Sequence, residues 1–197
     1  RKLEEEAKNF KDHAHSLDER LGALSTYTER YSSEEPALLH SLRMDTIDAY
    51  GVNAARMVSG HLQGRILKLI ASMTNAQRIL ELGTFTGYAS LCLAEGMDVH
   101  QHSSEPKLIT CEPDTKAINI AREFFERSPY GSRIDSREMS AETLMESLRE
   151  KNEKFDIVFI DADKRAYKEY LTTVLGITNG VNSDKVEIDP EKSLLVD

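Results

Sequence analysis

The chain has 197 residues, 40% of them hydrophobic and 30% charged, as in an ordinary soluble globular protein with an adequate core. Its formal net charge of −9 argues against a nucleic-acid backbone as the main partner, because phosphate binding needs clustered Lys and Arg. The apolar runs are too short to span a bilayer, so no membrane segment is expected.

The first predicted element is a helix from Leu3 to about Leu24, a charge-rich segment without proline. Its apolar residues recur at the spacing of one helical face. We expect this face to pack over the core or on a partner subunit, for instance in a homodimer. His13 and His15 point to different faces of such a helix, so a metal site is not expected there.

Two further helices are predicted before the first strand. Ser32 to Pro36 combine a serine cap, early acidic residues and a proline, which predicts a helix that runs to about Tyr50 and ends at Gly51. The next helix follows the segment 57–61, where Ser59 is a candidate cap. It places these apolar residues on one face: Leu62, Ile66, Leu69, Ile70 and Met73.

A glycine turn then separates an apolar run, Ile79 to Leu82, from an apolar-periodic segment, Tyr88 to Ala94. This pattern predicts a strand, a tight loop and a helix, a junction that brings backbone N–H groups close to a ligand. The spacing Glu-Leu-Gly-x-x-x-Gly differs from the Gly-x-Gly-x-x-Gly of dinucleotide sites, and the carboxylate of Glu81 favours a cation over a diphosphate.

Three motifs resemble the catechol and caffeoyl-CoA O-methyltransferase-like family of class I S-adenosylmethionine-dependent methyltransferases. They are Met-Val-Ser-Gly-His-Leu-Gln-Gly at 57–64, Glu-Leu-Gly-Thr-Phe-Thr-Gly-Tyr at 81–88 and Phe-Asp-Ile-Val-Phe-Ile-Asp-Ala-Asp-Lys at 155–164. The likeness covers roughly residues 34–168 and the final strand. It implies that S-adenosylmethionine is the cofactor.

The resemblance also implies roles for the first two motifs. Ser59 is expected near the carboxylate of the methionine moiety, and Glu81 is expected to face its amino group. The remaining expected contacts come from the glycine turn, at Gly83, Thr84, Gly87 and Ala89. Ala89 stands where the family often has a serine, which would contact the same carboxylate.

The second predicted strand, Leu108 to Glu112, follows a polar excursion at 97–106 that we expect to be a surface loop. An acid at the tip of this strand can accept hydrogen bonds from both ribose hydroxyls, so Glu112 is the predicted ribose ligand. The alternative is that it is merely exposed. Both cysteines, Cys92 and Cys111, fit buried thiols in a reducing, cytoplasmic compartment.

Asp114 is predicted to cap a helix, and Ile134 to Met139 form the third strand. Ser140 opens the next helix, and the resemblance places the backbone of Ala141 beside the adenine ring. Phe155 to Ile160 is nearly all apolar, as expected of a central parallel strand.

The fourth strand ends in Asp161-Ala162-Asp163-Lys164, and ligands of open α/β sheets sit at such strand ends. The resemblance implies that Asp161 binds a divalent metal, that Asp163 lies close to the cofactor and that Lys164 is the general base. The alternative is a solvated loop that caps the following helix.

These residue types suit the transfer of a methyl group to a phenol. A phenolic hydroxyl has a pKa of about 10 and is a poor nucleophile at neutral pH. A Mg²⁺ ion held by oxygen ligands would favour the phenolate and orient it. Lys164 could take the proton if its own pKa, ordinarily about 10.4, were lowered by that charge.

The C-terminal part departs from the family pattern. A helix at 166–175 is followed by a polar stretch, 176–192, and then by a predicted fifth strand that ends at Asp197. The resemblance makes Asp197 a second metal ligand, but the asparagine that should follow it is absent. We interpret the chain as shortened here, with its C-terminal strands missing.

The predicted fold is one α/β domain over 1–197, with N-terminal helices at 1–56 and a doubly wound, Rossmann-like core at 57–197 that is incomplete at its C-terminus. The mostly parallel sheet is expected in the order 3-2-1-4-5. The predicted function is S-adenosylmethionine-dependent, metal-assisted O-methylation of a small catechol-type or caffeoyl-CoA-like acceptor. A tRNA-modifying methyltransferase and a catalytically silent cofactor-binding protein remain alternatives.

Overall fold

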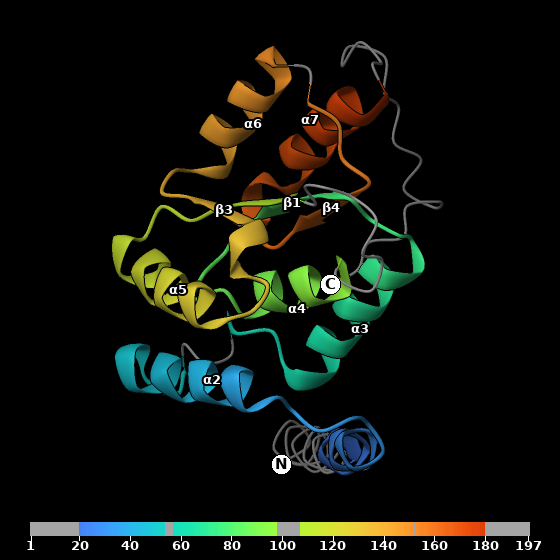
Figure 1. The fold of residues 1–197 in the computed structure, drawn as a ribbon, viewed down its shortest axis with the longest axis vertical. Helices are drawn as coiled ribbons and strands as arrows, with labels where there is room; N and C mark the ends of the chain where they lie inside the picture. Colours follow the sequence, from blue (N-terminus) through green and yellow to red (C-terminus); the bar gives the residue numbers. More distant parts are fainter. Residues whose placement is uncertain (1–19, 54–56, 98–106, 152, 180–197) are drawn as a thin grey trace, which may run out of the picture.

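A four-stranded parallel sheet in the order β3-β2-β1-β4 lies between two layers of helices (Figure 1). The computed structural model describes residues 20–53, 57–97, 107–151 and 153–179. Its strands are β1 Arg78–Leu82, β2 Lys107–Cys111, β3 Ile134–Arg137 and β4 Ile157–Ile160. The predicted class and the order of these four strands are confirmed, while the predicted fifth strand lies outside the described residues.

Alternate residues of each strand face opposite layers, because side chains along a strand point to the two faces in turn. Ile79 and Leu108 pack in a core cluster with α2 Ala37–Tyr50, α3 His61–Met73, α4 Tyr88–Met97 and α5 Thr115–Arg127. Leu80 and Ile109 pack in a second cluster with α6 Ala141–Glu150 and α7 Tyr167–Asn179. Short 3-10 turns, η2 Gly131–Arg133 and η3 Lys164–Ala166, precede β3 and α7. Residues 20–30 are also helical.

Helix α2 forms an additional layer beneath α4 and α5 in Figure 1. It begins at Ala37, with Pro36 in the N-cap position and no side-chain cap, so the predicted serine cap was wrong. Its predicted end is confirmed at Gly51, whose φ of 82° is a conformation that glycine adopts without strain.

The predicted apolar face of α3 is not the face that packs. Ile66 and Leu69 are each 55% exposed and Met73 is 77% exposed, whereas the buried residues are Gly64, Leu67 and Ala71. A Cβ added at Gly64 would lie 2.7 Å from Cys92 Sγ, so α3 approaches α4 too closely for a larger side chain. Small residues therefore decided which face of α3 is buried.

Ion pairs reinforce the contact between α3 and α4. Glu95 of α4 accepts hydrogen bonds from Arg65 Nη2 at 3.1 Å and from Lys68 Nζ at 2.6 Å.

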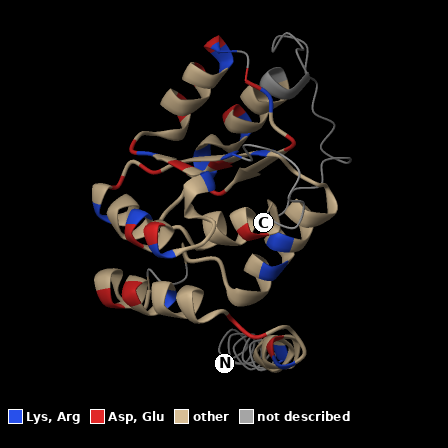
Figure 2. Cartoon of the chain, in the orientation of Figure 1, with Lys and Arg blue, Asp and Glu red and all other residues tan. Residues whose placement is uncertain are grey.

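Figure 2 shows acidic and basic residues interspersed on α2, α5 and α6. Cys92 and Cys111 are buried free thiols, as predicted. Within the described ranges, no helix has the length and apolar character needed to cross a bilayer.

Candidate functional site

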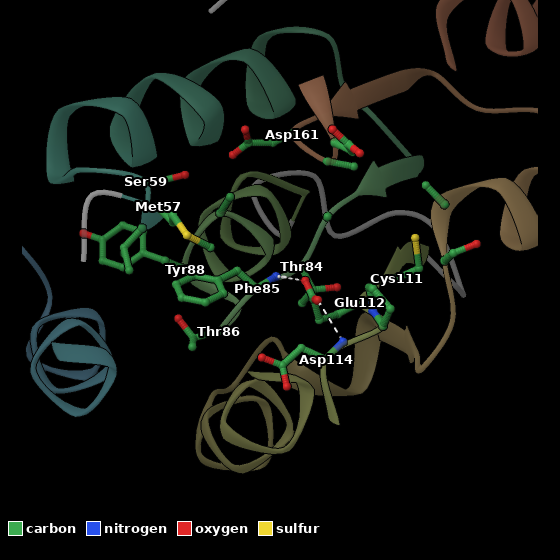
Figure 3. A pocket seen from close by; sticks show the side chains of 18 of the residues that line it. Met57, Ser59, Thr84, Phe85, Thr86, Tyr88, Cys111, Glu112, Asp114 and Asp161 are labelled. Atoms are coloured by element: carbon green, nitrogen blue, oxygen red, sulfur yellow. Dashed lines mark hydrogen bonds between the residues drawn. The ribbon is translucent and has the colours of Figure 1, made fainter. Parts of the chain in front are cut away.

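A cavity of about 820 Å³ opens at the carboxyl ends of β1, β2 and β4. Strand ends in an open parallel sheet are where ligands bind, because the loops there diverge. In the view of Figure 3, Glu112 and Asp114 lie toward one side of the cavity and Ser59 and Asp161 toward the other. The predicted residues that line it are Ser59, Gly83, Thr84, Ala89, Glu112, Ala141, Asp161, Asp163 and Lys164.

The glycine turn after β1 is held against the tips of both neighbouring strands. The backbone N–H groups of Gly83 and Thr84 donate to the carbonyl of Cys111 at 3.2 and 3.0 Å. Gly83 has a φ of +99°, and a Cβ there would lie 2.4 Å from the carbonyl oxygen of Asp161. Glycine is therefore required at 83 by the approach of β4 as well as by its backbone conformation.

We expect Gly83→Ala to lower the free energy of unfolding by more than about 2 kcal/mol, because it combines a left-handed φ with a clash against backbone. Urea denaturation would measure this. Gly22→Ala is the matched control, since nothing lies within 4 Å of a Cβ at that helical position. It should raise stability by about 0.5–1 kcal/mol. Equal effects of the two substitutions would contradict this account of Gly83.

Gly87 has a structural role, and its predicted contact with the cofactor stays a prediction. It is not among the residues that line the cavity. Its φ is +91°, and a Cβ would lie 2.6 Å from Phe125 Cε1 of α5. The second glycine of the motif thus lets the loop pack tightly on α5.

Ser59 lines the cavity at 6% exposure, and Gly60, not Ser59, occupies the N-cap position of α3.

Glu112 is held in position by two backbone donors. Its Oε2 accepts from the N–H of Phe85 at 2.9 Å, and its Oε1 accepts from the N–H of Asp114 at 3.0 Å, the dashed lines of Figure 3. A carboxylate oxygen has more than one lone pair, so both oxygens retain acceptor capacity. This acceptor set at the tip of β2 fits a pair of ribose hydroxyls.

Glu81 lies sealed beneath the cavity and is not one of its lining residues. Burial raises the pKa of its carboxyl to about 7, although hydrogen bonds from Ser90 and Thr110 oppose the shift. Oε2 accepts from the Ser90 hydroxyl, and Oε1 has no hydrogen-bond partner among the described residues. An unpartnered oxygen on a buried carboxylate would be stabilised by a nearby cation, which is the reason to expect the amino group of the methionine moiety close to Glu81. The contact itself stays a prediction.

Three charged residues after β4, Asp161, Asp163 and Lys164, line the cavity but differ in their partners. Arg165 binds the carboxylate of Asp163 through Nη2 at 2.7 Å and lowers its pKa to about 2. Burial raises the pKa of Asp161, and the nearby Lys164 ammonium opposes that shift. Asp163 is therefore an ionised residue already paired with Arg165, whereas the charge of Lys164 acts on Asp161.

The structure places one of the two predicted metal ligands in the site. Asp161 lines the cavity, and Asp197 lies outside the described residues. Among the described side chains, no cluster of three or more His, Cys, Asp or Glu is arranged to hold a metal ion. The described residues alone therefore do not provide a complete metal site.

Helix α2 reaches the glycine loop through polar contacts that the sequence motifs did not indicate. Thr46 of α2 donates to Thr86 at 2.8 Å, and both side chains are buried. The hydroxyl of Tyr88 donates to Glu35, just before α2, at 2.8 Å. Burial would raise the pKa of Glu35, but hydrogen bonds, led by that from Arg43, lower it to about 2. The loop is thus held from outside the motif.

Other residues that line the cavity were also missed by sequence reasoning. They include Tyr50, Phe85, Tyr88, Glu142 and Tyr170. The hydroxyl of Tyr170 on α7 donates to Glu142 on α6 at 2.6 Å, so these helices are joined at the cavity wall. A tyrosine at a helical position resembles any core aromatic residue in sequence, and no local spacing reveals its partner.

Comparisons with known proteins point to one family. The sequence profile described as O-methyltransferase matches residues 29–181. The O-methyltransferase ankF of Aspergillus thermomutatus is 32% identical over 159 residues, 80% of this chain and 63% of that protein. The catechol O-methyltransferase of Niastella koreensis is 34% identical over 117 residues, 59% of this chain and 51% of that protein.

A solved structure agrees with these relatives. The O-methyltransferase from Bacillus cereus in complex with SAH has a TM-score of 0.70 and 28% identity, covering 80% of this chain and 68% of that one. The chain spans 63% and 51% of the lengths of the two curated relatives above.

Proposed function

The chain belongs to the O-methyltransferase family, and we therefore propose that it transfers a methyl group from S-adenosylmethionine to a hydroxyl of a small acceptor. The proposed acceptor is catechol-type or caffeoyl-CoA-like, and the proposed helper is a divalent cation such as Mg²⁺. The observation that carries the proposal is the convergence of Glu112, Asp161 and Lys164 on one cavity of about 820 Å³.

The residues around the cavity have separate roles in the proposed reaction. Glu112 would accept hydrogen bonds from the ribose, and Glu81 would balance the ammonium group of the methionine moiety. Bound S-adenosylmethionine would supply an electrophilic methyl group. Because the reaction is an in-line displacement, most of the rate enhancement must come from holding donor and acceptor in place. Lys164, as the neutral amine, would take the proton of the acceptor hydroxyl on its Nζ. The resulting oxygen nucleophile would form the new bond to the methyl carbon as the carbon–sulfur bond of the donor breaks.

The metal part of the proposal is supported by Asp161 alone among the described residues. A carboxylate is a ligand type that Mg²⁺ prefers, and Asp161 lines the cavity. A bound cation would favour the ionised form of a phenolic acceptor. Its charge would also favour the neutral amine of Lys164, which is the form that can accept a proton.

The proposal predicts transfer of labelled methyl from S-adenosylmethionine to catechol in the presence of Mg²⁺. Excess chelator should reduce that transfer at least about tenfold if the cation assists the reaction. Calorimetric titration with S-adenosylhomocysteine (SAH), with and without chelator, is the control. It should show that the cofactor site itself is unaffected by removal of the metal.

Each outcome bears on a different part of the proposal. Transfer that persists in chelator would contradict the metal-assisted step while supporting the acceptor class. Binding of SAH without transfer under either condition would contradict the catechol-type acceptor and favour a silent binding role or an RNA acceptor. Absence of SAH binding would contradict the proposed function as a whole.

A further inference from the structure

Tyr50, the last residue of α2, contacts both residues that hold Glu112 in place. Its hydroxyl donates to Asp114 Oδ2 at 2.6 Å. Its ring packs on the ring of Phe85, with centroids 5.2 Å apart. Phe85 and Asp114 are the residues whose backbone N–H groups bind the two oxygens of Glu112. One side chain from α2 therefore supports both backbone donors of the Glu112 carboxylate.

Tyr50 is itself well anchored. The ammonium of Lys116 lies 4.4 Å from the centre of its ring, and the same group donates to the carbonyl of Ala49. One turn earlier, Thr46 ties α2 to the glycine loop at Thr86. The end of α2 is thus fixed to the glycine loop and to α5, so Tyr50 can act as a rigid support.

The carboxylate of Asp114 accepts a hydrogen bond through each of its two oxygens, so both bonds depend on its orientation. Its Oδ1 accepts from the N–H of Lys116 at 2.9 Å and caps α5, while its Oδ2 accepts from Tyr50. Burial raises the pKa of the Tyr50 hydroxyl, and the Asp114 carboxylate raises it further, so the hydroxyl stays protonated and remains a donor. The bond therefore persists across the pH range in which the protein would be assayed.

We propose that Tyr50 is a positioning residue of the ribose site, which orients Glu112 by holding Asp114 and Phe85 from α2. This inference rests on the proposed function, because it takes Glu112 to be the ligand of the cofactor ribose. It assigns to α2 a part in cofactor binding that lies outside the three sequence motifs. Without the hydroxyl, the turn at 112–114 loses its link to α2, and Glu112 is less well oriented.

A double-mutant cycle tests whether Tyr50 acts through Glu112. The affinity for SAH would be measured by calorimetry for the unaltered protein, Tyr50→Phe, Glu112→Gln and the double variant. Tyr50→Phe should weaken binding about fivefold when Glu112 is present, as for loss of one hydrogen bond. It should have less than about a twofold effect in the Glu112→Gln background, because the residue it positions is then altered.

Two further variants separate positioning from general stability. Tyr31→Phe is the matched control, because Tyr31 is 71% exposed and does not line the cavity, and its affinity for SAH should be unchanged. Asp114→Asn keeps a good capping residue but weakens the acceptor of the Tyr50 hydroxyl. It should reproduce the loss seen in Tyr50→Phe, and combining the two should add little. Thermal unfolding would be recorded for every variant.

The outcomes distinguish this inference from the proposed function. Equal losses from Tyr50→Phe in both backgrounds would show that Tyr50 acts independently of Glu112 and would overturn the inference, as would unchanged affinity in Tyr50→Phe. If the unaltered protein binds no SAH, the proposed function is contradicted, and the inference about Tyr50 is contradicted with it because it depends on that function. Loss confined to the background that contains Glu112 would establish the positioning role.

Discussion

Replacing Lys164 by alanine is expected to lower kcat for methyl transfer about 10²–10⁴-fold, the contribution of a positioned general base. Lys164 begins η3 directly beyond the tip of β4 and lines the cavity. The dissociation constant for SAH should change less than about twofold, because the proposed role of Lys164 is toward the acceptor hydroxyl. Methyl-transfer kinetics at saturating cofactor, together with calorimetry, would measure both quantities.

Two variants identify which property of Lys164 matters. Lys164→Arg keeps the positive charge, but a guanidinium cannot give up its proton at neutral pH, so activity should stay as low as in Lys164→Ala. Lys168→Ala removes an exposed lysine from α7 that does not line the cavity, and it should leave kcat unchanged. Restored activity in Lys164→Arg would mean that charge, not proton transfer, is the contribution of Lys164.

Glu112→Gln is expected to weaken SAH binding about tenfold to a hundredfold, because hydrogen bonds to a charged acceptor are stronger than those to a neutral amide. The substitution also leaves one of the backbone N–H groups of Phe85 and Asp114 facing an amide N–H₂ in place of an acceptor. Calorimetry would measure the affinity. A 2′,3′-dideoxy analogue of SAH lacks the two ribose hydroxyls, so it should bind to the variant and to the unaltered protein with nearly the same affinity.

Glu123→Gln on α5 is the matched control, since it removes the same charge from an exposed position outside the cavity. Its SAH affinity should equal that of the unaltered protein. An unchanged affinity in Glu112→Gln would remove the ribose assignment. An equal loss for SAH and its dideoxy analogue would place the effect of Glu112 elsewhere than on the ribose hydroxyls.

The predicted carboxyl ends of β1, β2 and β4 agree with the structure to within one residue, because they rest on local signals. The third strand ends at Arg137 and not at the predicted Met139. An apolar run followed by glycine or a carboxylate marks where a buried strand ends, and parallel strands end at the same edge. The strand ends therefore predict that Glu112, Asp161 and Lys164 lie at one site, and all three line the cavity. The sequence predicted Gly83 as part of a tight turn. It did not reveal the close approach of Gly83 to Asp161, because that approach depends on how β4 pairs with β1.

In helix α3 the periodicity of apolar residues does not predict which face is buried. Its apolar residues do recur at helical spacing, but the face that packs is formed by Gly64, Leu67 and Ala71. Periodicity measures where apolar residues lie around an axis, whereas burial depends on how closely another helix approaches. The proximity of Cys92 and Tyr88 of α4 to Gly64 made small residues decisive.

Patterns of neighbouring residues along the chain predict the α/β class, the carboxyl ends of β1, β2 and β4, and the carboxylates and lysine at the cavity. The support that α2 gives to the site is visible only in the folded protein, because it runs through the contact of Tyr50 with Asp114, 64 positions away. Such a pair leaves no mark in local spacing, since a hydroxyl and a carboxylate become partners only when packing brings their elements together.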